Sequence, residues 1–105
     1  MAFRALFLSH APDADKDVHR CEINTGMYRL WTVVVRGQDE AVEVASQFAQ
    51  KEGIDAVLLC PGFTHADVAE IKAAVGDRVA VGVARCDGPG GRVSAAARKR
   101  EGYGG

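Results

Sequence analysis

The alternation of β-prone runs with segments of helical period is the feature that most limits what this chain can fold into. Residues 28–36, 54–60 and 78–85 are rich in valine, leucine and other residues that favour strands. The intervening segments 39–52 and 64–75 carry apolar residues three and four positions apart, as a buried helix face does, and each is followed by a glycine. Strands that alternate with helices indicate βαβ crossovers and a parallel sheet, so the predicted fold class is α/β.

An earlier apolar run, residues 2–9, predicts a further strand and gives the order strand, strand, helix, strand, helix, strand. The polar residues 11–27 are interpreted as a connection that can hold a short helical turn at 15–21. The prediction is a single small domain over residues 1–87, with a mostly parallel four-stranded sheet and two crossover helices. Residues 88–105 are glycine-rich and basic, and we interpret them as a tail that is flexible or packed on a partner subunit.

Size, charge and cysteine content exclude several classes of protein. A chain of 105 residues suits one domain, and a net charge of −1 creates no field that would attract nucleic acid or an anionic membrane. The longest apolar run, residues 30–35, is too short to span a bilayer. The N-terminus lacks the features of a signal peptide, and three widely spaced cysteines match neither a disulfide framework nor a zinc site. We therefore expect reduced thiols and a cytoplasmic protein.

The apolar content of the predicted strands indicates a partner. Two helices cannot cover both faces of a four-stranded sheet. Residues 54–60 are apolar almost throughout, which is the pattern of a strand that is covered on both faces, and residues 28–36 carry Trp31 and three valines. We expect another copy of the chain to cover the second face, in a homo-oligomer that is most simply a dimer.

Reactive side chains gather where the predicted strands end, and open parallel sheets bind ligands at this edge. His10 directly follows an apolar strand, and it is either a proton-transfer group or a hydrogen-bonded residue that ends the strand. Cys60 precedes a helix N-terminus, a position that favours the thiolate, although many cysteines are simply buried. Arg85 can bind a carboxylate or phosphate with two hydrogen bonds, or it can pair with Asp87 or a helix carboxylate.

The segment LLCPGFTH, residues 58–65, is first a strand-to-helix turn. Thr64 is followed three positions later by an aspartate, which predicts a helix N-cap. Gly62 is interpreted as providing a backbone conformation that glycine adopts readily, and it would also leave room for a ligand near the main chain, so the two interpretations are compatible. His65 is interpreted as a solvated residue or as a neutral acid–base group. From this corner, Gly62, Phe63 and Thr64 are predicted to bind a ligand.

His19 and Arg20 lie in the long connection. A long segment with little secondary structure is uncommon inside a compact domain and is often functional, so we interpret the connection as a lid over the sheet edge. The predicted catalytic residues are therefore His10, Cys60 and His19. The predicted ligand-binding residues are Arg85 and Arg20, together with the corner residues.

Three segments of the chain resemble those of a family of short bacterial proteins that is catalogued as a domain of unknown function. They are HAPDAD with a following HR pair in residues 10–20, the LCPGF corner at 59–63, and VGVAR at 81–85. The corner of the family usually has a second glycine where this chain has Pro61, which stiffens the turn and can alter the ligand. The resemblance covers roughly residues 2–87 and implies a small α/β fold without an established reaction.

Two functions fit these observations. The first is a small cofactor-free metabolic enzyme, an isomerase, cyclase or lyase, that acts on a carbonyl- or carboxylate-bearing small molecule by acid–base chemistry. In it, His10 transfers the proton, Cys60 is the partner acid or base, and Arg85 holds the anionic group. The alternative is a non-catalytic, oligomeric protein that binds a small molecule in the same pocket. No cofactor and no metal are expected, because the glycine-rich nucleotide motifs and HExxH are absent. A mononuclear metal site of His10, His19 and an acidic residue stays open as a weakly supported alternative.

Overall fold

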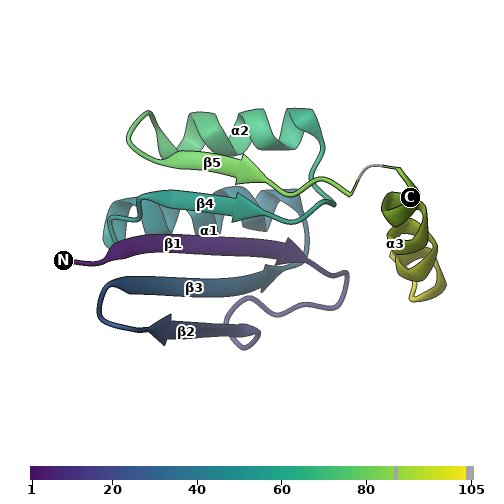
Figure 1. Ribbon diagram of the computed structural model, residues 1–105, viewed down its shortest axis with the longest axis horizontal. Helices are drawn as coiled ribbons and strands as arrows, with labels where there is room; N and C mark the ends of the chain where they lie inside the picture. The colour runs from purple at the N-terminus through teal and green to yellow at the C-terminus, as the bar shows by residue number, and fades with distance from the viewer. Residues whose placement is uncertain (87, 104–105) are drawn as a thin grey trace.

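Five strands and three helices make up the part of the chain that the computed structural model describes, residues 1–86 and 88–103. In chain order they are β1 (Phe3–His10), β2 (Arg20–Asn24), β3 (Tyr28–Val35), α1 (Gln38–Lys51), β4 (Ala56–Leu59), α2 (His65–Val75), β5 (Ala80–Val83) and α3 (Pro89–Arg100). Figure 1 shows a small α/β domain, which confirms the predicted fold class.

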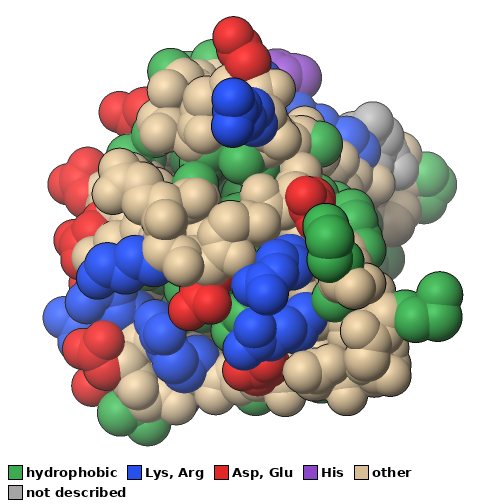
Figure 2. Space-filling view, turned by 90° about the vertical axis from the view of Figure 1, so that its left-hand side faces the viewer, with side chains coloured by type: hydrophobic (Ala, Val, Ile, Leu, Met, Phe, Trp, Pro, Cys, Tyr) green, Lys and Arg blue, Asp and Glu red, His purple; other side chains and the backbone are tan. Residues whose placement is uncertain are grey.

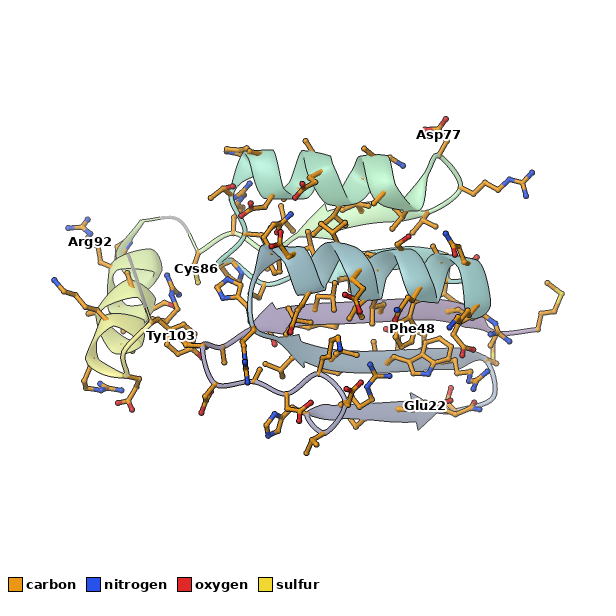
Figure 3. All side chains as sticks on the ribbon, turned by 180° about the vertical axis from the view of Figure 1, so that it is seen from behind. Glu22, Phe48, Asp77, Cys86, Arg92 and Tyr103 are labelled. Carbon is orange, nitrogen blue, oxygen red and sulfur yellow. The ribbon has the colours of Figure 1, made fainter. Side chains whose placement is uncertain are left out.

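The strands form one mixed sheet in the order β2-β3-β1-β4-β5. Strands β1, β3, β4 and β5 are parallel, and β2 is antiparallel to β3. The crossovers from β3 to β4 and from β4 to β5 move in the same direction across the sheet. Because such crossovers are right-handed, α1 and α2 lie on the same face, behind the sheet in Figure 1 and in front of it in Figure 3.

The prediction of four strands was wrong, because β2 lies within the connection 11–27. All five residues of β2 are exposed, and its alternation of polar and apolar residues extends over only the five positions Arg20–Asn24, with a single strongly apolar residue, Ile23. A hairpin turn joins β2 to β3, with the amide of Gly26 donating to the side-chain oxygen of Asn24 at 2.9 Å. Ahead of β2, the amide of His19 donates to the carbonyl of Asp15 at 2.7 Å and closes a turn. The strand is therefore defined by its pairing with β3.

The C-terminal region contains a helix that the sequence interpretation did not include. Within the predicted tail 88–105, α3 begins at Pro89, a residue whose fixed φ suits the first helical position. Alanine, lysine and arginine have high helix propensity, which accounts for a helix that buries none of its residues. It stands beyond the carboxyl ends of the strands and covers neither face of the sheet (Figure 1). Asp87 and the glycines at 104–105 lie outside the described residues.

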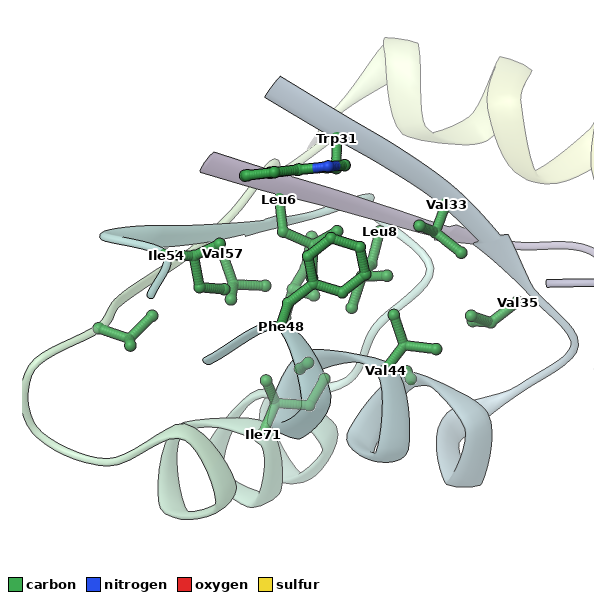
Figure 4. Close-up of a cluster of buried hydrophobic side chains, with 14 of the residues drawn as sticks. Leu6, Leu8, Trp31, Val33, Val35, Val44, Phe48, Ile54, Val57 and Ile71 are labelled. Carbon is green, nitrogen blue, oxygen red and sulfur yellow. The ribbon is translucent and has the colours of Figure 1, made fainter. Parts of the chain in front are cut away.

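The hydrophobic core lies between the sheet and the helices α1 and α2. As the helical period predicts, α1 buries Ala41, Val44, Ala45 and Phe48, and α2 buries Ile71. The rings of Trp31 and Phe48 meet edge to face, with their centroids 5.4 Å apart. Figure 4 shows these side chains converging from both layers. The strands contribute the residues that point toward the helices: Leu6, Leu8, Trp31, Val33, Val35, Val57 and Leu59.

The opposite face of the sheet is not covered by any of the described helices (Figure 1). Leu58 of β4 points to this face and is 41% exposed. Within a single chain, the strand β4 is therefore covered on one face, as expected if a second copy of the chain is to cover the other. An uncovered apolar face is the feature from which the oligomer was predicted, and that expectation stays a prediction.

An ion pair between Glu22 and Arg29 fastens β2 to β3. The hydrogen bond from Arg29 lowers the pKa of Glu22. A lowered pKa in the folded state adds stability above the ordinary glutamate pKa, and this stability is lost as the pH falls through the folded-state value. We expect Glu22→Gln to reduce the loss of stability between neutral pH and a pH below about 4.3, measured by urea denaturation. Asp77→Asn, in the exposed turn after α2, is the control; an unchanged pH dependence in Glu22→Gln would contradict the prediction.

Candidate functional site

The carboxyl ends of β1, β4 and β5 meet at one edge of the sheet, beside the N-terminus of α2. The amide of Cys60 donates to the carbonyl of Leu8 at 3.1 Å, and the amide of Ala84 donates to the carbonyl of Leu59 at 2.9 Å. These hydrogen bonds hold the three strand ends level with one another. His10, Cys60 and Arg85, which stand at or just beyond those ends, therefore share this edge, as the parallel topology predicts.

The imidazole of His10 is the best-defined side chain at this edge. The ring is half-buried and meets the ring of Phe63 edge to face, with their centroids 5.1 Å apart. The centroid of the Tyr103 ring lies 6.5 Å from that of His10. On a third side the imidazole packs on the backbone of Gly62. Two adjacent residues of the corner and one residue near the C-terminus thus surround the ring.

A glycine is required at position 62 because the His10 ring occupies the space that a side chain there would need. A methyl group at this position would overlap Nε2 of His10 and lie 2.8 Å from Cε1. The glycines with positive φ are found elsewhere in the described chain and do not include Gly62. The interpretation that Gly62 provides a special backbone conformation was therefore wrong. The second interpretation was that a ligand could approach the main chain at Gly62; in this structure the side chain that approaches it is His10 of the protein itself.

Cys60 is a half-buried free cysteine that packs against the core. Its position before α2 is as predicted, and its backbone pairs with β1. A chemical role for the thiol stays a prediction.

Arg85 forms a hydrogen bond to His65, the first residue of α2. Nη2 of Arg85 lies 2.9 Å from Nδ1 of His65. Because a guanidinium only donates, Nδ1 of His65 is the acceptor, and this places the proton of a neutral His65 on Nε2. Both side chains are exposed. The other predicted partner of Arg85, Asp87, lies outside the described residues.

Thr64 is the N-cap of α2, as predicted. Its hydroxyl oxygen accepts from the amide of Asp67 at 3.1 Å, and its own amide donates to the Asp67 carboxylate at 2.9 Å, which completes a capping box. The corner is therefore a rigid strand-to-helix turn, with Gly62 against His10 and with His65 against Arg85. A ligand-binding role for Thr64 stays a prediction.

His19 does not join His10. The carbonyl of His19 accepts from Val34, whereas His10 pairs with Val35 on the other side of β3. The strand β3 therefore separates the two backbones, by about 10 Å at the usual strand spacing. Nδ1 of His19 accepts from the amide of Asp15 at 2.9 Å and so helps to close the turn before β2.

Arg20 also lies away from the edge and packs on α1. Its guanidinium carbon is 5.7 Å from the centroid of the Phe48 ring, and its Nε donates to the carbonyl of Lys16 at 2.8 Å. The predicted lid is anchored as well, since Ala14 is buried and its carbonyl accepts from Nε of Arg36 at 3.0 Å. These contacts hold the connection in place next to β3 and α1, so the residues that form them stabilise the fold.

Two residues of the site were not among the predicted site residues. The first is His65, which was interpreted as solvated or as a neutral acid–base group. Because it follows the N-cap Thr64, it lies at the same edge of the sheet as the end of β5. Tyr103 follows α3, and Figure 3 shows it between this helix and the sheet. No sequence signal links Tyr103 to His10, because the contact depends on where α3 stands.

The opposite end of the sheet has a different character. A cavity of about 540 Å³ lies there, lined mainly by the loops before β4 and β5, with Asp55, Asp77 and Arg78 among its residues. Figure 2, which views this end, shows basic and acidic side chains interleaved, so neither sign of charge dominates.

In residues 1–86 and 88–103, no three His, Cys, Asp or Glu side chains are grouped to hold a metal ion. No helix of this part is long and apolar enough to cross a membrane.

The fold and the edge define a class of small α/β proteins in which one sheet face is covered by helices and polar side chains gather at the strand ends. The chain belongs to a family of unknown function, DUF6506, whose family model matches residues 3–98. This confirms the resemblance and extends it past residue 87 into α3. Among curated proteins and among solved structures, no similar protein was found.

Proposed function

We propose that the protein is a small, cofactor-free enzyme that binds a carbonyl- or carboxylate-bearing small molecule at the strand-end edge and moves a proton on it. The observation that carries this proposal is the fixed position of the His10 ring between Gly62, Phe63 and Tyr103. Imidazole is the side chain best suited to exchange protons near neutral pH. A proton-transfer group acts efficiently when packing holds it in one orientation.

The pair of Arg85 and His65 is the proposed anchor for the anionic group. The guanidinium uses one nitrogen on His65 and keeps others to donate to a carboxylate. The pair stands at the first residue of α2, where the helix dipole favours negative charge. The short corner from Gly62 to His65 thus connects the proton-transfer group to the anchor. Cys60, which begins the corner, is the proposed partner acid or base.

Exposure of the anchor favours a second candidate, a binding protein without catalysis. Arg85 and His65 are exposed, and His10 is only half-buried. Acid–base catalysis gains from the exclusion of water, which an exposed edge does not provide by itself. A protein that only holds a small anion needs no such exclusion.

Solvent exchange tests the acid–base proposal across a range of candidate substrates at once. A panel of small keto acids and related carbonyl compounds is incubated with the protein in D2O, and exchange of the carbon-bound hydrogen next to the carbonyl is followed by NMR. We expect the protein to accelerate exchange for one chemical type in the panel. His10→Gln should reduce this acceleration by about 100-fold or more, which is the usual contribution of a general base.

The matched control is His19→Gln, which removes a histidine one strand away from His10 and should leave the exchange rate unchanged. Exchange that survives both His10→Gln and Cys60→Ala would rule out the acid–base proposal. Thermal stabilisation by a panel compound without exchange, lost in Arg85→Ala and kept in Cys60→Ser, would identify the binding protein instead.

A further inference from the structure

We propose that the sheet face opposite α1 and α2 is the interface of a homodimer, in which two copies of this chain stack face to face. We call this surface the open face. Its residues are the strand positions that alternate with the core positions, among them Phe7, Leu30, Leu58 and Ile23. This proposal is independent of the chemistry proposed for the strand-end edge.

The charges of the strands are directed away from the open face. The guanidinium of Arg4 donates to the carbonyl of Glu52 at the end of α1, and Arg20 packs over Phe48. The guanidinium of Arg29 lies 4.6 Å from the centroid of the Trp31 ring. These three arginines therefore lie on the helix-covered side. A sheet with one solvated face normally has the reverse pattern, with its polar residues on the uncovered side.

The open face is uncharged across the whole sheet. One row of paired residues runs Ile23, Leu30, Ala5, Ala56 and Ala80, and the next runs Cys21, Thr32, Phe7, Leu58 and Gly82. Neither row contains a charged residue. Ile23 is 54% exposed and Leu58 is 41% exposed. Ala5 and Ala56, in the middle of the first row, are buried by their neighbours, so the exposed apolar area is contributed by the larger side chains around them. Exposed apolar surface contributed by several strands marks an interaction site.

The size of the open face fits a second copy of the chain. The strands have eight, five, eight, four and four residues, and each strand residue occupies roughly 16 Å² of the sheet plane. The face thus spans about 450 Å² in projection, and two stacked copies span about 900 Å² before side-chain relief adds to the contact area. Stable interfaces bury about 1,200–2,000 Å² of accessible surface, so the projected area falls below this range and the side chains that stand out from the sheet must contribute the difference.

The open face is uneven in relief. The strands β2, β3 and β1 carry most of its bulky residues, Ile23, Leu30 and Phe7, whereas β4 and β5 carry Ala56, Ala80 and Gly82 beside one bulky residue, Leu58. Leu58 lies next to Gly82, with a methyl carbon 3.5 Å from where a side chain would begin there. A two-fold axis near the middle of the sheet sets the bulky half of one copy over the small half of the other. Such interlocking lets two sheets pack closely.

Sedimentation equilibrium of the full chain tests the proposal. We expect wild type to be a dimer at micromolar concentration, and Leu58→Asp and Ile23→Asp each to raise the dimer dissociation constant by about 100-fold or more, because a two-fold interface buries the new charge twice. Both positions are exposed in the protomer, so the variants should keep the wild-type circular dichroism spectrum. Val93→Asp, at a 72% exposed position on α3, is the matched control and should remain dimeric.

Three results would overturn the proposal. These are a monomeric wild type up to the highest soluble concentration, a dimer that survives both Leu58→Asp and Ile23→Asp, and a dimer that dissociates only with Val93→Asp. The last result would assign the contact to α3. If Leu58→Asp fails to fold, Ile23→Asp at the more exposed edge strand β2 decides the question.

Discussion

Replacing Phe63 by alanine is expected to lower the free energy of unfolding by about 3–5 kcal/mol. Phe63 is only 2% exposed, and it belongs to the core cluster although it lies in the strand-to-helix corner. Domains of this size are stable by about 5–15 kcal/mol, so the loss would be a large share of the total. The same substitution removes the ring that His10 meets edge to face.

Urea denaturation at neutral pH measures this effect, and the histidine signals in an NMR spectrum report the freedom of the His10 ring. Val18→Ala, at an exposed position of the connection before β2, is the control and should change stability by less than about 0.5 kcal/mol. Phe63→Ala with near wild-type stability would mean that Phe63 does not anchor the corner to the core.

Gly62→Ala is expected to cost about 1–3 kcal/mol of stability and to move the His10 imidazole out of its position. The new methyl group would overlap Nε2 of His10, so either the ring or the corner must shift. Removal of the ring should relieve the clash. The double variant Gly62→Ala with His10→Ala should therefore be more stable than the sum of the two single effects predicts, with a coupling energy of about 0.5–3 kcal/mol.

A double-mutant cycle measured by urea denaturation provides this coupling energy. Gly90→Ala is the matched control, since a methyl group at Gly90 on α3 meets no atom within 4 Å among the described residues, and it should be neutral or slightly stabilising. Additive effects of Gly62→Ala and His10→Ala would contradict the proposed contact. If His10 is the proton-transfer group, Gly62→Ala should also reduce the exchange reaction while His19→Gln leaves it unchanged.

Hydrophobic periodicity was sufficient to predict the central part of the fold. The spacing of Val44 and Phe48 set the buried face of α1, and the valine-rich run 28–36 identified β3. The two helices and four parallel strands followed, together with the edge at which those strands end. Parallel topology alone was enough to bring His10, Cys60 and Arg85 to that edge.

The remaining parts depend on contacts that periodicity does not encode. The strand β2 has no buried side chain, and its five-residue alternation of polar and apolar positions is too short to predict a strand within a polar connection. His19 and Arg20 were assigned to the site because that strand was missed, and its pairing with β3 carries them away from His10. The helix α3 buries none of its residues, and Tyr103 lies near His10 only because α3 stands at the strand ends.

The central position of β1 has a consequence for how the chain folds. This strand is the first along the sequence, but its two neighbours in the sheet are β3 and β4. One edge of β1 therefore stays without hydrogen-bond partners until β4, far along the chain, pairs with it, as Ala5 does with Ala56. Parallel pairing between distant residues is slow to form, because the intervening chain must be closed into a loop first. Until β4 joins, an apolar strand with an unpaired edge is available to other chains. Charged substitutions at the exposed Phe3 are therefore expected to improve the yield of refolding more than they change the stability of the folded protein.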